Sequence, residues 1–117
     1  MARKMAEKYD PELEAEARAF IAEITGTQVP SGSLFMQALK DGKVLCQLVN
    51  TLSPGIVKKI NKMKMPFMQM ENIGFFLSAV QTFGVGASES FMTVDLYEAK
   101  NPGAVLLCLD SLKRSTG

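Results

Sequence analysis

Side chains that commonly carry chemistry are scarce in this chain. The sequence has no histidine and two cysteines, Cys46 and Cys108, which are far apart. Without histidine, Ser-His and Cys-His nucleophile pairs cannot form, and most zinc sites are excluded. Two separated cysteines cannot hold a metal alone, and free cysteine is usually a small core residue. We therefore expect neither an enzyme nor a metal or cofactor site, and we expect both cysteines to be buried and reduced.

The most unusual chemistry belongs to a short cationic stretch, "IVKKINKMKMPFMQMENI", from Ile56 to Ile73. It holds four lysines, no acid before Glu71, and four of the eight methionines. We call residues 56–65, which precede Pro66, the basic segment. Lysine is almost never fully buried without a partner, so we expect each lysine to be exposed. Such a segment could contact an acidic partner, or it could be a solvated loop over the core.

Two kinds of partner fit the basic segment poorly. It has no arginine and no ladder of aromatic residues, which nucleic-acid readers and stacking platforms need, and the whole chain carries a net charge of only +1. A membrane-surface helix is also disfavoured, because Pro66 separates the lysines from the apolar helix that follows. No apolar run is long enough to predict a membrane span. We expect contact with neither nucleic acid nor a membrane.

The elements that must position this segment begin with a helix near the N-terminus. With 117 residues, 47% of them hydrophobic, the chain fits one globular domain. Asp10 and Pro11 provide an N-cap and a first helical residue, and Gly26 predicts a left-handed C-cap. Helical spacing predicts one buried face made of Leu13, Ala17, Phe20, Ile21 and Ile24.

Two helices are predicted before the basic segment. The first is short and ends at an Asp41-Gly42 turn, with Leu34, Phe35 and Leu39 facing inward. The second has its apolar face at Val44, Leu45, Leu48, Val49 and Leu52, and it stops at Ser53-Pro54-Gly55.

Two further helices are predicted after the basic segment. The strongest helical pattern starts at Pro66 and ends near Gly84, with Met70, Ile73, Leu77 and Val80 on one face and Phe76 and Phe83 beside it. The last helix is capped by Asn101, begins at Pro102, and turns inward Val105, Cys108, Leu109 and Leu112.

These patterns predict an all-α fold, a bundle of about four main helices with shorter linking helices. Residues 1–8 are expected to be a flexible lead-in, residues 9–114 the domain, and residues 115–117 a C-terminal tail. The predicted centre of the core is Phe20, Leu45, Leu48, Ile73, Leu77, Val105 and Leu109.

Several pieces, in order, resemble the calponin homology domain of the single-domain calponin and transgelin type. The most specific is "LKDGKVLCQLVN", followed by "MENIGFFLSAVQTFGV" and then "TVDLYEAKN". The resemblance extends from about Lys8 to Arg114. One departure is that Phe20 stands where the family usually has tryptophan; phenylalanine keeps an apolar ring but loses volume and an N–H donor.

The resemblance implies a cytoskeletal module that binds, and could bundle or stabilise, actin filaments. The family contacts filaments through parts of its first helix and through the segment before its third main helix. The second region corresponds here to Lys58, Lys59, Ile60, Lys62, Lys64 and Met65. Full-length members often carry a C-terminal calponin-like repeat, so this chain either lacks the repeat or is a fragment.

Two other functions stay open at this stage. One is an adaptor that binds signalling or cytoskeletal proteins without affinity for actin, and the other is a microtubule-binding module. The N-terminus has no apolar core of a secretory signal, and two isolated cysteines suit a reducing compartment. We expect a monomer that is cytoplasmic and associated with the cytoskeleton.

Overall fold

The computed structural model describes residues 9–116, so the expected lead-in at residues 1–8 lies outside the described residues. Within this part of the chain every regular element is helical, and the all-α prediction is confirmed. The elements are α2 (Pro11–Thr25), α3 (Ser33–Leu39), α4 (Lys43–Leu52), α5 (Pro66–Thr82), the 3₁₀ helix η1 (Ala87–Glu89), α6 (Thr93–Tyr97) and α7 (Pro102–Thr116).

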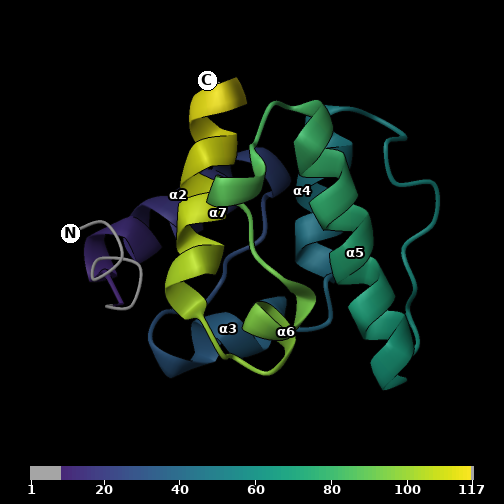
Figure 1. Ribbon diagram of the computed structural model, residues 1–117, viewed down its shortest axis with the longest axis horizontal. Helices are drawn as coiled ribbons and strands as arrows, with labels where there is room; N and C mark the ends of the chain where they lie inside the picture. The colour runs from purple at the N-terminus through teal and green to yellow at the C-terminus, as the bar shows by residue number, and fades with distance from the viewer. Residues whose placement is uncertain (1–8, 117) are drawn as a thin grey trace.

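Within residues 9–116, four helices form the body of the fold, and three short ones link them. Helix α4 packs against both α2 and α5, while α7 packs against α2 and α6. Figure 1 shows α2 and α7 on one side of the molecule and α4 and α5 on the other, with α3 and α6 at one end. The basic segment connects α4 to α5 as an extended chain that runs antiparallel alongside α5.

The predicted helix ends are confirmed where local chemistry defines them. The Asp10 carboxylate accepts hydrogen bonds from the backbone N–H groups of Glu12 and Leu13, and Pro11 is the first helical residue. Gly26 has φ 78°, the left-handed conformation that glycine adopts at low cost. The Asn101 side chain likewise accepts from the backbone N–H of Ala104 at the start of α7.

The core lies where these helices meet. Six of the seven residues predicted at its centre are buried, namely Phe20, Leu45, Leu48, Ile73, Val105 and Leu109. Leu77 is the exception, since it is only half-buried at the edge of the core. The buried residues of α5 are Asn72, Ile73, Phe76, Ala79 and Val80. Ile73, Phe76 and Val80 of the predicted face are therefore confirmed, whereas Met70 and Leu77 are half-buried. The buried face is centred closer to Phe76 than predicted, because apolar residues occur all around this helix and periodicity does not single out one side.

A second correction concerns α3. Leu34 was predicted to face inward, but its exposed fraction is 52%, and Met36 is buried in its place with Phe35 and Leu39. A helix of seven residues has too few turns for spacing alone to determine its orientation. At the other end of the chain, α7 continues through Ser115 and Thr116, and Gly117 lies outside the described residues.

Replacing Leu48 by alanine should lower the free energy of unfolding by about 2–5 kcal/mol, because it removes a fully buried side chain and leaves a cavity. Leu77→Ala should cost clearly less, since Leu77 is half-buried and its site can fill with water. Urea denaturation of both variants measures the difference. Equal losses would contradict this placement of the α5 face.

Both cysteines should resist thiol reagents in the native protein. Cys46 and Cys108 are fully buried, as predicted. Burial raises the pKa of Cys46 to about 12 and the pKa of Cys108 to about 12. Between pH 7 and 9 the reactive thiolate is therefore scarce as well as inaccessible. A chromogenic disulfide reagent should react slowly until denaturant is added; fast native labelling of either residue would show that its helix is misplaced.

Candidate functional site

The basic segment is exposed at the lysines and held by its other residues. Lys58, Lys59, Lys62 and Lys64 are all exposed, as predicted. Ile60 is half-buried against the core, and Met65, 43% exposed, is the N-cap residue of α5. The structure therefore brings the six candidate residues together on one continuous loop, with the charges outward and Ile60 inward.

One end of the basic segment is fixed by Asn50 of α4. The Asn50 Nδ2 donates to the carbonyl oxygen of Val57 at 3.0 Å, and its Oδ1 accepts from the Val57 N–H at 2.8 Å. This pairing resembles one rung of a β-ladder, with a side-chain amide in place of the neighbouring strand. Val57 is also buried, at 7% exposure. The two hydrogen bonds to Asn50 thus fix the backbone directly before Lys58.

The middle of the basic segment is fixed by Asn72 of α5, which is fully buried. Its Oδ1 accepts from the Asn61 N–H at 2.8 Å, and its Nδ2 donates to the Asn61 carbonyl oxygen at 2.9 Å. The same Nδ2 donates to the Asp41 carbonyl oxygen at 2.9 Å. One amide therefore joins the basic segment, α5 and the turn between α3 and α4.

The backbone beside Asn72 is equally constrained. Gly42 has φ 76°, and a Cβ on it would lie 2.6 Å from the Asn72 Cβ and 2.9 Å from the Ile73 nitrogen. Glycine is therefore required for both conformation and space. The Cys46 thiol lies 3.2 Å from the Asn72 carbonyl oxygen and donates to it. The motif "DGKVLC" thus packs directly on α5.

A third asparagine, Asn61, bonds the basic segment to the first turns of α5. The Asn61 Nδ2 donates to the Met68 carbonyl oxygen at 3.2 Å and to Glu71 Oε1 at 2.8 Å. Glu71 is the acid nearest in sequence to the lysines, and this hydrogen bond orients its carboxylate toward Asn61. None of the four lysines forms an ion pair with any residue from 9 to 116.

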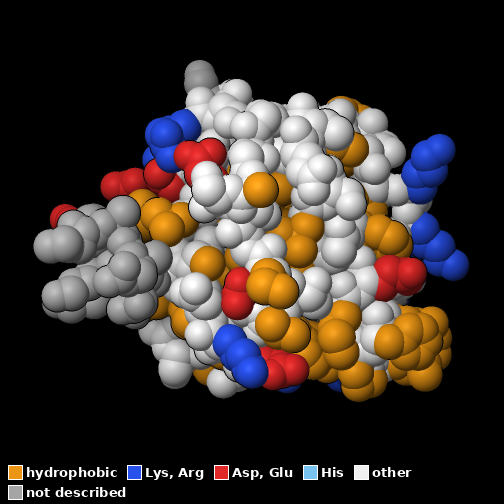
Figure 2. Space-filling view, viewed as in Figure 1, with side chains coloured by type: hydrophobic (Ala, Val, Ile, Leu, Met, Phe, Trp, Pro, Cys, Tyr) orange, Lys and Arg blue, Asp and Glu red, His pale blue; other side chains and the backbone are white. Residues whose placement is uncertain are grey.

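Exposed apolar side chains lie next to the lysines. Met63, Met65 and Phe67 have exposed fractions of 59%, 43% and 59%. Figure 2 shows this apolar patch over the start of α5, with basic side chains projecting from the neighbouring edge of the molecule. A surface that joins exposed lysines to methionine and phenylalanine can provide both charge attraction and adaptable apolar contact.

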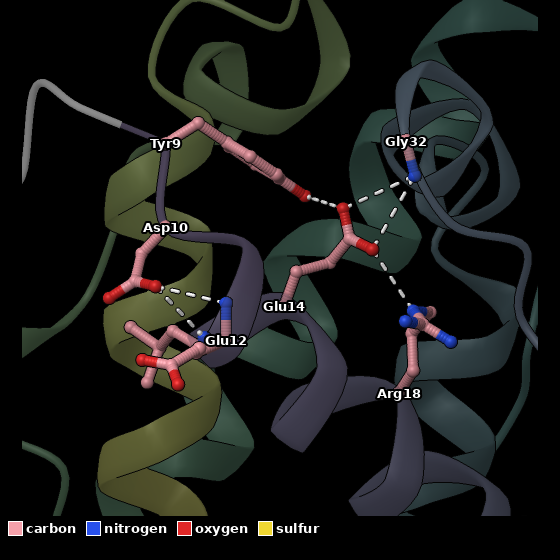
Figure 3. Close-up of polar contacts among 7 residues, drawn as sticks. Tyr9, Asp10, Glu12, Glu14, Arg18 and Gly32 are labelled. Carbon is pink, nitrogen blue, oxygen red and sulfur yellow. Dashed lines mark hydrogen bonds and ion pairs between the residues drawn. The ribbon is translucent and has the colours of Figure 1, made fainter.

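A second polar cluster lies in α2, the other region that the resemblance implicates. Glu14 is buried at 4% exposure, yet its carboxylate accepts from the Tyr9 hydroxyl at 2.6 Å, Arg18 Nε at 3.0 Å and the Gly32 N–H at 3.3 Å (Figure 3). Burial and the hydrogen bond to Glu14 raise the pKa of Tyr9 well above its usual range. This cluster fixes the start of α2 on the loop before α3.

Sequence reasoning missed the buried polar residues of these two regions, Asn72 and Glu14; a third buried polar residue, Ser111, lies in α7. A signal was present in each helix: Glu14 lies three residues before Ala17 and seven before Ile21, and Asn72 lies four before Phe76. These spacings put both polar side chains on the buried faces of their helices.

The described residues do not provide the groups that a metal site or a membrane-spanning helix needs. Among residues 9–116 no group of three or more cysteine, aspartate or glutamate side chains could hold a metal ion. No helix in that range has both the length and the apolar character to span a membrane. Every buried side-chain nitrogen or oxygen there has a hydrogen-bond partner.

Comparison with protein families gives a match over nearly the whole chain. The model of the calponin homology (CH) domain matches residues 11–116. Myophilin from Echinococcus granulosus is 42% identical over 114 residues, which are 97% of this chain and 60% of myophilin. Muscle-specific protein 20 from Drosophila melanogaster is 42% identical over 113 residues, 97% of this chain and 61% of that protein. The chain spans less than two thirds of both relatives.

Solved structures agree with this match. The calponin homology domain of an IQGAP protein from Schizosaccharomyces pombe superposes with a TM-score of 0.77 at 32% identity, covering 87% of this chain and 65% of that one. The calponin homology domain of Rng2 from the same organism gives a TM-score of 0.76 at 33% identity, covering 86% of this chain and 64% of that one.

Replacing Asn72 by alanine should release the basic segment. The change leaves the Asp41 carbonyl and both backbone groups of Asn61 without their partner, so the free energy of unfolding should fall by about 1–3 kcal/mol or more. Hydrogen exchange at the Asn61 amide should accelerate. The matched control is Asn61→Ala, which keeps these backbone bonds and removes two partly exposed ones; it should change both quantities little. Unchanged exchange in Asn72→Ala would contradict this role.

Proposed function

The chain belongs to the calponin homology domain family, as its motifs predicted, and from this premise we propose that it binds actin filaments through the basic segment. The observation that carries the proposal is a fixed loop whose four lysines are exposed and form no ion pair with a described residue. Lysines without such partners leave a local cationic surface on a nearly neutral chain. An acidic filament surface complements that charge.

The anchoring of the loop favours binding. Ordering a flexible segment on contact costs conformational entropy, and a preformed segment avoids most of that cost. Asn50 fixes the chain at Val57 and Asn72 fixes it at Asn61, so the lysines project from a backbone that is already ordered. Met63 and Met65 add polarisable side chains that can repack against a partner. This combination supports Lys58, Lys59, Ile60, Lys62, Lys64 and Met65 as the contact.

A filament-binding role would place the protein in the cytoplasm with the cytoskeleton. The two other functions considered, an adaptor without affinity for actin and a microtubule-binding module, make different predictions in one experiment. Sedimentation with actin filaments and, separately, with microtubules at low and moderate salt distinguishes all three. We expect the chain to sediment with actin and not with microtubules.

Replacing Lys58, Lys59, Lys62 and Lys64 together by glutamate should abolish sedimentation with actin, because attraction becomes like-charge repulsion across the contact. The fold should survive, since exposed substitutions usually change stability by less than about 0.5 kcal/mol each. Circular dichroism and urea denaturation verify the fold. Added salt should weaken binding of the wild type in the same direction, because exposed charges are screened beyond about 8 Å at physiological ionic strength.

Two double variants distinguish the effect of local charge on binding from the effect of net charge. Lys58→Glu/Lys59→Glu and Lys100→Glu/Lys113→Glu change the net charge equally, and all four positions are exposed. Only the first pair should weaken sedimentation strongly. If the folded fourfold variant sediments like the wild type, the basic segment is not the contact. The search would then move to the outer face of α2, around Glu16, Arg18 and Glu23.

A further inference from the structure

A groove separates the start of the basic segment from the second half of α5. Its volume is about 480 Å³, within the range of ligand-binding clefts. The floor is apolar, made by Ile56 and Val57 on one side and by Phe75 and Ala79 on the other. Val57 and Ala79 are buried, while Ile56 and Phe75 pack partly against the core. The floor is therefore built from residues that the fold already holds in place.

The two walls of the groove differ in chemistry. Lys58 and Lys59 rise from the basic segment on one side, and Ser78 and Thr82 rise from α5 on the other; all four are exposed. None of the eight described residues that line the groove is acidic. The Thr82 hydroxyl donates to the Ala79 carbonyl oxygen at 2.7 Å, which leaves its oxygen free to accept. An occupant therefore meets two cations, two hydroxyls and an apolar floor.

Lys58 and Lys59 also line a second hollow. That hollow has a volume of about 590 Å³ and includes Lys62, Met63 and Met68. The two lysines therefore belong to the lining of both concave surfaces. A chain that contacts both surfaces would meet these charges, and the groove can accept one of its side chains.

We propose that this groove binds an acidic protein segment with one bulky apolar side chain, the acids facing Lys58 and Lys59 and the apolar side chain seated on the Val57–Ala79 floor. Charge complementarity selects acids, because the walls contain cations and no anion. The buried floor selects an apolar anchor, since anchors in desolvated pockets carry most of the energy of an interface. A lipid surface fits less well because it is flat and the floor is recessed.

The inference rests on the proposed function in one respect: it states what the actin filament would have to present at the basic segment. A contact made only by charge would depend on the lysines and not on the groove. A contact with an apolar anchor would depend on both. Variants that fill the groove without changing any charge therefore separate the two.

Ser78→Trp and Thr82→Phe each place a ring over the groove from an exposed position on α5, so the fold should tolerate them. Gln81→Trp is the matched control, since Gln81 is also exposed on α5 and does not line the groove. Circular dichroism verifies each fold. Two groove-filling variants keep the test valid if one of them fails to fold.

The first measurement uses a short dye-labelled peptide of aspartate and glutamate with one central phenylalanine, and a twin with alanine in its place. By fluorescence anisotropy the phenylalanine peptide should bind the wild type and Gln81→Trp about tenfold more tightly than its twin, the size of effect expected for one anchor residue. Ser78→Trp and Thr82→Phe should abolish the difference. Equal affinity of the twins for the wild type, or loss of the difference in Gln81→Trp, would overturn the inference.

The second measurement is sedimentation with actin filaments. Ser78→Trp should weaken binding about tenfold, and Gln81→Trp should behave as the wild type. If Lys58→Glu/Lys59→Glu loses binding and Ser78→Trp does not, the inference fails and the proposed function stands. If the wild type binds the phenylalanine peptide more tightly than its twin but does not sediment with filaments, the proposed function is wrong and the inference about the groove is supported.

Other occupants are tested under the same conditions with phosphatidylserine vesicles and single-stranded DNA. Binding of either that Ser78→Trp abolishes, with no difference between the twin peptides, would assign the groove to that ligand and overturn the inference.

Discussion

The side-chain amide of Asn72 is the interaction on which the arrangement of the candidate site depends. It is fully buried and bonds to Asn61 in both directions and to the Asp41 carbonyl. A buried amide without these partners would cost free energy, so its burial is stable only when loop, turn and helix take their places together. Gly42 permits the close approach that this requires. The geometry of the basic segment is therefore a consequence of core packing.

Glu14 has a comparable role at the other side of the molecule. Its buried carboxylate accepts from Tyr9, Arg18 and Gly32, so its charge is balanced by Arg18 and by two further donors. Buried polar groups of this kind add little net stability but specify which segments meet. Glu14 thus joins α2 to the loop before α3, and Asn72 of α5 joins that helix to the basic segment.

Anchoring by asparagine explains how a lysine-rich connection can be ordered and still available. Asn50 and Asn72 satisfy backbone groups of the basic segment, so the lysine side chains are not needed to hold it. The four lysines extend into solvent beside Met63 and Phe67, both exposed. The backbone of the basic segment is therefore held in place like that of a regular element, while its exposed side chains are suited to contact with a partner. A recessed apolar floor lies beside it.

The sequence by itself determined the features that local chemistry encodes: the caps at Asp10, Gly26 and Asn101, the four main helices, and the exposure of the lysines. Each depends on residues within a few positions of one another. Tertiary structure alone decided the orientation of α3, the half-buried place of Leu77, and the partners of Asn72 and Glu14. Those hydrogen bonds join residues 11, 18 and 31 positions apart. Periodicity can put a polar residue on a buried face, but which donor or acceptor meets it there depends on how whole helices pack.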